Sequence, residues 1–286
     1  MKKLKIAYFG SPDFSAEFLE KLLTDTDLPV ETVSVVTPPD KPAGRKGIST
    51  PVPVKQIAQK HNVPVIDSLQ ELDSDLDLGL LFAYGEILPK EVLKKPKHGI
   101  WNIHPSLLPL YRGAAPMATP LIEGVSNTGV TLMKMDEQLD HGPIIAQEEA
   151  DILPKERHPE LAKRLSNLSY KLFKKAVNEF VSHENSIHMR DQDDAKATFT
   201  KTFTKQDGFT PTTDFSEKPQ EVFNRFRGLY PWPGLWTKVI LNDREQRLKI
   251  TDLDIEEGKL IIKKVQLEGK KEVGYSSFKE AYKINL

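Results

Sequence analysis

The chain contains no cysteine. This absence excludes a disulfide framework, a thiol nucleophile and a zinc site built from thiolates, and it is compatible with a reducing compartment. We therefore expect a cytoplasmic protein. The seven histidines are scattered and show no H-E-x-x-H spacing, so the sequence predicts no metal site.

The chain also lacks a long apolar run and a strong net charge. No stretch approaches the ~20 apolar residues that a membrane-spanning helix needs. The first apolar run is short and reaches Asp13, which is typical of a strand rather than a signal peptide. The net charge of -1 gives no support to a strongly basic nucleic-acid binder. With 286 residues, 38% of them apolar and 28% charged, we expect a globular protein of two domains.

The first half of the chain alternates short apolar runs with segments of helical spacing. Apolar positions at Phe14, Phe18 and Leu22 predict a helix over residues 14–23. Such alternation is typical of a parallel sheet with helices on both faces, so we predict an α/β fold with a doubly wound, mostly parallel, Rossmann-like sheet. The other predicted elements are strands at 5–10, 30–36, 64–66 and 78–83, a β-rich stretch at 129–135, and helices at 51–61 and 160–181.

The pattern changes near residue 183. A polar, Thr- and Asp-rich stretch that runs to about residue 213 indicates a linker, which we place at 186–204. Beyond it, the dipeptides Asn242-Asp243 and Glu257-Gly258 separate short strands predicted at 236–241, 247–250 and 259–265. The predicted organisation is therefore a first domain over 1–185, the linker, and a small β-rich domain over 205–286.

Asn102 and His104 form the most informative pair in the chain. They lie two residues apart, directly after the apolar run 99–101, and two prolines, a serine and a glycine follow. In a strand, alternate side chains share a face, so this pair is expected to point the same way at a strand end. An amide and a protonated imidazole both donate hydrogen bonds and together can hold a developing oxyanion. The alternative is a pair of buried polar side chains whose hydrogen bonds are satisfied within the fold and which have no catalytic role.

Asp140 is the third candidate for this site. It follows the predicted strand at 129–135, and a carboxylate beside His104 would favour the imidazolium and could pass protons. The alternative is a solvated acidic turn, which we favour for Asp136 and Glu137. His141 is a rival for the same role, but in an extended segment its side chain should point away from that of Asp140.

Two further segments bear on ligands. The turn at 10–13 resembles the first βα turn of a nucleotide-binding sheet, but it lacks the second and third glycines of G-x-G-x-x-G, and no P-loop pattern occurs. The sequence therefore predicts neither a dinucleotide nor ATP. The loop at 37–55 is rich in proline and cations, including Lys41 and Arg45. A loop of this length is either functional, with cations that can meet phosphates, or a solvated linker.

Seven segments, in order along nearly the whole chain, resemble the folate-dependent formyltransferases, most closely those that formylate methionyl-tRNA. The tripeptide 102–104 with Asp140 marks only the broad superfamily, whereas the loop PDKPAGR, the segment RGAAP and the stretch PWPG are more specific. The segments are 9–14, 39–45, 83–89, 102–109, 111–116, 139–142 and 227–237.

The resemblance implies a first domain that binds 10-formyltetrahydrofolate and a second, OB-like β-barrel domain that contacts initiator methionyl-tRNA. It implies that Asn102 and His104 stabilise the oxyanion, and that Asp140 keeps His104 charged and helps to move the proton. It also implies that Lys41 and Arg45 approach the acceptor end of the tRNA. We further expect a monomer with no membrane association. The residues that the resemblance assigns to the folate are Ser106, Leu107, Leu108 and Pro109, and, lining the pterin pocket through backbone groups, Ala83, Tyr84, Gly85, Ile87 and Leu88.

Two other functions remain compatible with parts of this pattern. A sugar-nucleotide N-formyltransferase would use the same cofactor and the same polar triad, but the basic proline-rich loop and the stretch at 227–234 argue against it. A non-catalytic folate- or RNA-binding protein would have no need of a proton shuttle, so the retained triad argues against that function.

Overall fold

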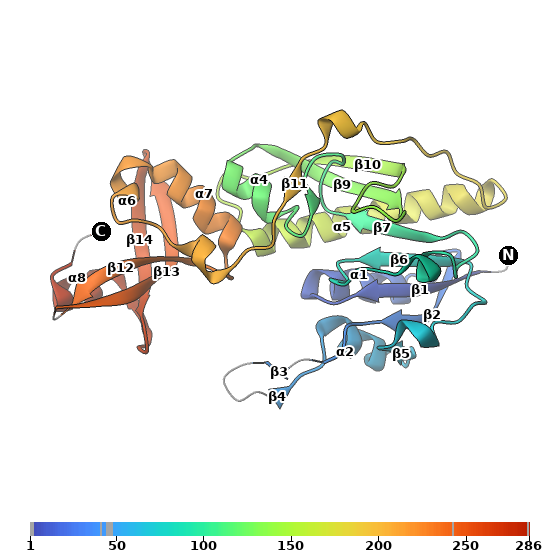
Figure 1. The fold of residues 1–286 in the computed structure, drawn as a ribbon, viewed down its shortest axis with the longest axis horizontal. Coiled ribbons are helices and arrows are strands. Elements are labelled where there is room, and N and C mark those ends of the chain that lie inside the picture. Colours follow the sequence, from blue (N-terminus) through green and yellow to red (C-terminus); the bar gives the residue numbers. More distant parts are fainter. Residues whose placement is uncertain (1–2, 41, 44–47, 242, 285) are drawn as a thin grey trace. The chain divides into compact units, whose positions relative to one another are not determined.

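The computed structural model describes residues 3–40, 42–43, 48–241, 243–284 and 286 (Figure 1). By its internal contacts the chain divides into two compact units. Unit 1 holds Met1–Ala114, Thr128–Ala150 and Ala162–Thr200, and unit 2 holds Ala115–Asn127, Asp151–Leu161 and Lys201–Leu286. Two segments that precede residue 162 therefore belong to unit 2, and unit 1 extends to Thr200. In the described residues, no helix combines the length and apolarity needed to cross a membrane.

A seven-stranded sheet forms the centre of unit 1. Its order is β10-β9-β7-β6-β1-β2-β5, with parallel pairing between β1 and β2, β1 and β6, β6 and β7, and β2 and β5. The pairing of β9 with β7 breaks the pattern, because it is antiparallel. The predicted doubly wound, mostly parallel sheet is confirmed. The strands are β1 (Leu4–Gly10), β2 (Val30–Val36), β5 (Val65–Ile66), β6 (Leu78–Phe82), β7 (Ile100–His104), β9 (Asn127–Lys134) and β10 (Ile144–Asp151).

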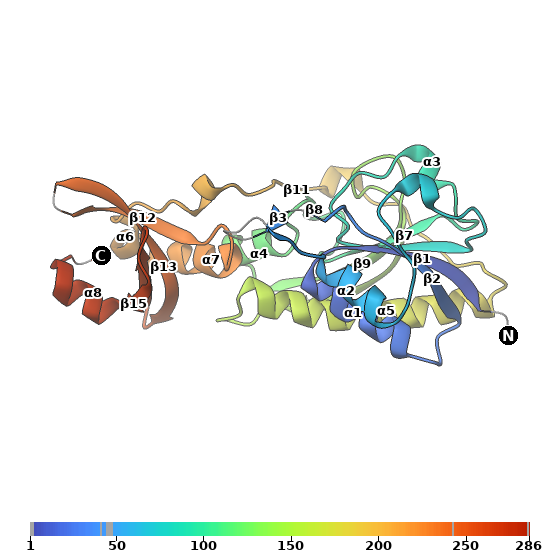
Figure 2. The same cartoon turned by 90° about the horizontal axis from the view of Figure 1, so that it is seen from below.

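Both faces of the sheet are covered, as a parallel sheet requires. Helices α1 (Asp13–Thr24) and α5 (His158–Ser182) lie on one face (Figure 2). There Tyr8 of β1 stacks on Phe18 of α1, and Phe18 also meets Phe173 of α5. On the other face Phe9 packs edge-on against Tyr84 in a cluster that includes Val92 of α3 (Lys90–Leu93). Helix α2 (Pro53–Lys60) packs on α1. The neighbouring side chains of Tyr8 and Phe9 thus point to opposite faces of the sheet and pack in two separate hydrophobic cores.

The strand order creates one topological switch point. From β1 the chain runs outward through β2 to β5 and then returns to place β6 on the other side of β1. In such sheets ligands bind outside the carboxyl ends of the strands at the switch point. Strands β1, β6 and β7 end at Gly10, Phe82 and His104, so the loops that follow these residues leave from the same edge of the sheet.

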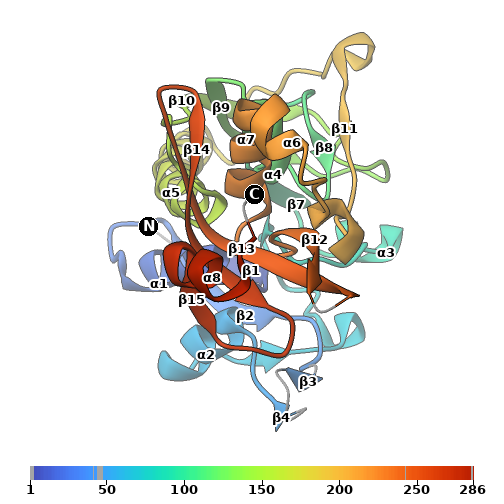
Figure 3. The ribbon, with the colours of Figure 1, turned by 90° about the vertical axis from the view of Figure 1, so that its left-hand side faces the viewer.

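Unit 2 is built on a four-stranded antiparallel sheet in the order β12-β13-β14-β15 (Figure 3). Its buried side bears Leu235, Val239, Leu248, Ile250 and Val265, which share one core with residues of the flanking helices. The predicted β-rich fold of the C-terminal part of the chain is therefore confirmed. Its elements are α6 (Asp214–Glu217), α7 (Pro219–Leu229), β12 (Leu235–Leu241), β13 (Arg244–Glu256), β14 (Lys259–Leu267), β15 (Glu272–Gly274) and α8 (Tyr275–Tyr282).

Gly228 allows α7 to pack tightly on α4 (Ala118–Glu123). A Cβ added at Gly228 would lie 2.7 Å from the backbone oxygen of Ala118 and 2.6 Å from Cγ1 of Ile122. Although alanine is favoured over glycine in a helix, we expect Gly228→Ala to lower the free energy of unfolding by roughly 1–3 kcal/mol. Urea unfolding measures this loss. Glu221→Ala, at an exposed position on the same helix, should change it by less than about 0.5 kcal/mol, and equal losses would contradict the packing argument.

Candidate active site

Strand β7 brings Asn102 and His104 to the carboxyl edge of the sheet on one face. Both side chains are buried, with exposed fractions of 5% and 4%. The strand is paired on both sides, with β6 at Leu81↔Asn102 and with β9 at His104↔Thr131. Because this pairing fixes the backbone on both sides, the pair has a rigid support.

Ser106 fixes the orientation and tautomer of the His104 ring. The Ser106 Oγ lies 2.9 Å from Nδ1 of His104 and donates its proton to the backbone oxygen of Leu110 at 2.7 Å. A hydroxyl has one proton to donate, so Nδ1 must carry the hydrogen of the 2.9 Å contact. The other ring nitrogen, Nε2, is therefore the one that faces the candidate site.

Asp140 meets this pair from the loop between β9 and β10. Its Oδ2 lies 3.2 Å from Nε2 of His104, an ion-pair distance at which the N–H is not aligned for a hydrogen bond. Its Oδ1 accepts a long hydrogen bond of 3.5 Å from Nδ2 of Asn102, and Oδ2 accepts one of 2.7 Å from the Gly113 N–H. The structure thus brings the three predicted residues together, although Asp140 is far from Asn102 and His104 in sequence.

The environment of Asp140 keeps it ionised. Burial acts to raise the pKa of this carboxyl, but the contact with His104, the Gly113 N–H and the charge of Arg112 together hold the pKa below its usual value. At neutral pH Asp140 is therefore a carboxylate. A buried carboxylate beside an imidazole and an amide donor is an arrangement suited to oxyanion stabilisation and proton transfer.

A family model described as formyl transferase matches residues 3–177. The chain belongs to the formyl transferase family. It is similar to a methionyl-tRNA formyltransferase of Caldicellulosiruptor saccharolyticus, with 35% identity over 98% of each chain. It is also similar to one of Staphylococcus epidermidis, with 38% identity over 89% of this chain and 81% of the relative.

A solved structure also resembles this formyl transferase in fold. It is an N-formyltransferase from Helicobacter canadensis, in complex with folinic acid and dTDP-3-aminofucose. The likeness has a TM-score of 0.61 at 20% identity and covers 96% of this chain and 99% of that one.

His141, the sequence rival of Asp140, points to other partners. Its Nδ1 lies 2.6 Å from Oδ2 of Asp136, and its Nε2 lies 3.2 Å from Oδ2 of Asp194. The side chain therefore bridges the Asp140 loop to the segment around Asp194. It makes none of the contacts that join Asp140 to His104.

This bridge predicts a pH dependence of stability. The hydrogen bond to Asp136, and with it the charge of Asp194, raises the pKa of His141 above its usual value. A histidine whose pKa is raised by folding stabilises the protein fully below the unfolded pKa of about 6.5, and this gain is lost as the pH rises through the folded pKa. Because the side chain is 29% exposed, we expect a contribution of at most about 1 kcal/mol.

Urea unfolding of the parent and of His141→Gln measures this contribution. The stability advantage of the parent should be largest near about pH 5.5 and should shrink by about pH 8.5. An advantage that grows with pH would show that the neutral ring, not the imidazolium, makes the bridge.

The loop after β6 places the predicted pterin-lining residues of this formyl transferase in two groups. Tyr84 and Leu88 are buried in the core of unit 1, and burial, aided by the charge of Glu86, raises the pKa of Tyr84 to about 12. Ala83 and Gly85 have positive φ angles of 56° and 88°, and the Ile87 side chain is 93% exposed. Two side chains thus anchor the loop and leave its backbone groups as the parts that can meet a ligand.

Thr131 holds the second predicted folate segment, Ser106–Pro109, through two hydrogen bonds. The Thr131 hydroxyl donates to the backbone oxygen of Ser106 at 2.7 Å and accepts from the Leu108 N–H at 3.0 Å. The Leu108 side chain belongs to a small buried cluster, and Leu107 lies against Gly129, where a Cβ would approach its Cδ2 to 2.5 Å. Pro109 follows Leu108 through a cis peptide bond. Much of this segment is therefore structural as well as close to the site.

Lys41 and Arg45 lie outside the described residues. At the edge of their loop, Asp40 pairs with Lys55 at 2.8 Å. Among the residues that the structure does describe, no group of three or more histidine or carboxylate side chains is placed to hold a metal ion.

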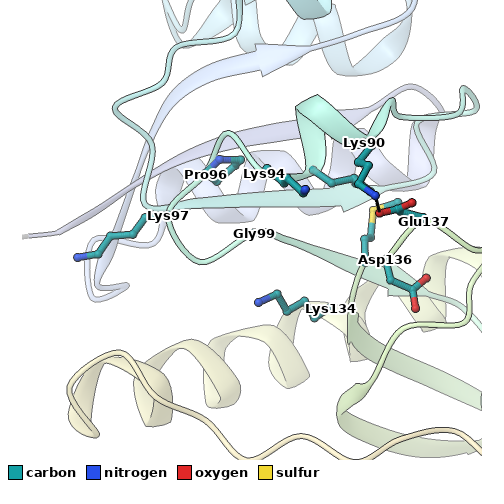
Figure 4. A pocket seen from close by; sticks show the side chains of 10 residues that line it. Lys90, Lys94, Pro96, Lys97, Gly99, Lys134, Asp136 and Glu137 are labelled. Atoms are coloured by element: carbon teal, nitrogen blue, oxygen red, sulfur yellow. Dashed lines mark ion pairs between the residues drawn. The ribbon is translucent and has the colours of Figure 1, made fainter.

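A lysine-lined cavity of about 350 Å³ lies at the other end of β7, beside Gly99 (Figure 4). Lys90 and Lys94 border it from α3 and the residue after it, and Lys134 borders it from β9. Lys90 pairs there with Glu137. Since His104 ends β7 and Gly99 precedes it, this cavity is separate from the candidate active site.

Proposed function

We propose that the protein transfers a formyl group from 10-formyltetrahydrofolate to the α-amine of initiator methionyl-tRNA. The family uses folate-derived formyl donors. The observation that carries the proposal is the convergence of Asn102, His104 and Asp140. It occurs in a chain that is similar along nearly its whole length to named methionyl-tRNA formyltransferases.

Asn102 and His104 act on the formyl oxygen in this proposal. As the methionyl nitrogen bonds to the formyl carbon, negative charge develops on that oxygen. Nδ2 of Asn102 and Nε2 of His104 are the donors that face it. Because both are buried, they are already oriented and act in a poorly screened environment, where hydrogen bonds to a developing charge are strongest.

For Nε2 to act as a donor in this proposal, the His104 ring must be protonated. Nδ1 of His104 already gives its hydrogen to Ser106, so Nε2 can donate only if the ring is an imidazolium. The Asp140 carboxylate at 3.2 Å supplies the countercharge for that form. A neutral ring with this tautomer would instead present a lone pair to a carboxylate.

Asp140 also offers a route for the proton. When the new carbon–nitrogen bond forms, the amine nitrogen must lose a proton, and when the bond to the folate nitrogen breaks, that nitrogen must gain one. A carboxylate at the centre of the site, beside the imidazolium, can accept the first proton and return it to the leaving nitrogen. Protons and charge then balance over the whole transfer.

The binding roles follow the same proposal. The backbone of Ala83, Gly85 and Ile87 and the segment Ser106–Pro109 would border the folate, at the switch point where such ligands bind. Lys41 and Arg45 would contact tRNA phosphates. In unit 2, the exposed side chain of Trp232 is an aromatic surface that a nucleic acid can stack on.

One residue of the stretch at 227–234, which is among the more specific segments of the resemblance, has a structural role. Arg227 is buried, donating to the backbone oxygen of Leu153 at 3.2 Å and to Oδ1 of Asn224 at 2.8 Å. This side chain holds α7 to the segment at 151–157 within unit 2, so it is not a candidate for direct tRNA contact.

The test is a competition assay. Purified protein receives 10-formyltetrahydrofolate with equal concentrations of charged initiator tRNA and a dTDP-amino sugar. We expect formyl-methionyl-tRNA as the main product. Formylation of the sugar alone would support the sugar-nucleotide alternative, and no product at micromolar enzyme would overturn both.

A further inference from the structure

The segment at 190–200 contacts the two loops that supply the candidate site, residues 105–113 after β7 and residues 135–143 after β9. At one end Arg190 forms a two-way backbone bridge with Ile144, at 2.8 and 2.9 Å. At the other end β11 (Phe199–Thr200) pairs in parallel with β8 (Arg112–Gly113). These residues all lie in unit 1. We call residues 190–200 the strap.

Gln192 of the strap uses every hydrogen-bonding group of its amide. Its Nε2 donates to the backbone oxygens of Asp140 and Gly142, both at 2.8 Å. Its Oε1 accepts from Nε and Nη2 of Arg112, at 3.1 and 2.8 Å. A side chain with all these bonds satisfied has one orientation, so it can fix the groups at both of its ends.

Arg112 is itself a rigid support. The side chain is 4% exposed, and its Nη2 also donates to Oδ1 of Asp194 at 2.7 Å. Arg112 precedes Gly113, whose N–H donates to the carboxylate of Asp140. The β8 strand thus binds the Asp140 carboxylate, and Gln192 binds the Asp140 backbone. Gln192 therefore links these two parts of the site through Arg112.

The backbone of Asp140 needs such a support. Its φ of 48° lies in the left-handed region, which is unfavourable for a residue other than glycine. If Gln192 is removed, two loop carbonyls lose their partner, and the loop is free to relax toward an ordinary conformation. That relaxation would move the carboxylate away from His104.

We propose that Gln192 is a positioning residue for the formyl transfer, holding the Asp140 loop so that its carboxylate stays against His104. This inference rests on the proposed function, because it assumes that Asp140 takes part in the reaction. No contact between Gln192 and either substrate is needed.

The test uses two variants with different losses. Gln192→Met keeps the length of the side chain and removes donor and acceptor together. Gln192→Glu keeps an oxygen for Arg112 and removes both donors. We expect both to lower kcat roughly 10- to 100-fold, the range that follows from misplacing a catalytic group by about 1 Å. The KM values for folate and tRNA should stay within about threefold of the parent, since substrate contacts are retained.

A pH profile separates positioning from simple instability. The charged groups that face Asp140 are His104 from β7 and Arg112 from β8, and both hold its pKa down. If the carboxylate moves away from them in Gln192→Met, its pKa rises, and the acid limb of kcat/KM shifts to higher pH. Loss of folded protein would instead lower the rate equally at every pH. Gln59→Met, at an exposed position on α2, is the matched control and should match the parent.

The outcomes distinguish the inference from the proposed function. Full activity of Asp140→Asn would overturn the role of Asp140, and the inference with it. Loss of activity in Asp140→Asn combined with parental rates in both Gln192 variants would overturn only the inference. Recovery in Gln192→Glu alone, or an unshifted acid limb with a reduced rate, would show that the residue supports Arg112 or the fold rather than the Asp140 loop.

Discussion

Asn102→Ala is expected to lower kcat by roughly 100- to 1,000-fold, which corresponds to about 2.7–4 kcal/mol of lost transition-state stabilisation. The amide is buried at the end of β7 and is held on both sides by paired strands. Its Nδ2 lies 3.5 Å from Asp140, a distance at which that bond is weak. In the proposed mechanism, the amide therefore makes its strong hydrogen bond only when charge develops on the formyl oxygen.

Single-turnover formylation of methionyl-tRNA measures this effect, because it isolates the chemical step from product release. Asn102→Asp provides a second variant of nearly the same shape that lacks the donor and adds a charge beside Asp140, so its loss should be at least as large. Asn178→Ala is the matched control, since that exposed amide donates to the Lys174 backbone oxygen on α5, away from the site. A rate for Asn102→Ala within about tenfold of the parent would contradict an oxyanion role.

The central strands of unit 1 could be predicted because strands such as β1 and β6 are buried on both faces. Runs such as 6–10 and 78–83 are continuously apolar, and the helix at 14–23 shows its period in Phe14, Phe18 and Leu22. Strand β13 (Arg244–Glu256) was predicted only at 247–250, because its exposed positions carry charged residues that weaken the pattern. Helix α7 was not predicted at all, because its buried positions include Asn224, Arg227 and Gly228, which weaken the apolar period.

The candidate site could be predicted only in part, because local sequence patterns do not encode contacts between distant segments. The pairing of Asn102 with His104 follows from the two-residue period of a strand. The contact of Asp140 with His104 depends on a loop that doubles back after β9, and no local pattern encodes that path. Gln192 had no signal, because its partners, two backbone carbonyls and the Arg112 side chain, are brought to it only by the fold. A glutamine in a polar stretch is otherwise typical of a linker.

His104→Ala and Asp140→Ala are expected to be strongly non-additive. Each should lower kcat by roughly 100- to 10,000-fold, the range of a general acid–base group. The double variant should be no slower than about tenfold below the slower single variant. The reason lies in the 3.2 Å contact between Nε2 and Oδ2. In the proposed mechanism the Asp140 carboxylate is the countercharge of a protonated His104 ring, and without the ring it has nothing to act on.

The measurement is a double-mutant cycle in single-turnover formylation, with each rate referred to the folded fraction found by circular dichroism. Losses that multiply would show that the two residues act independently, and the contact between Nε2 and Oδ2 would then be structural. Asp140→Asn refines the cycle, because it keeps the shape and an oxygen for the Gly113 N–H while removing the charge. If Asp140→Asn is as slow as Asp140→Ala, the charge beside His104 is what the reaction needs, whereas a nearly active Asp140→Asn would leave shape alone as the contribution of this residue.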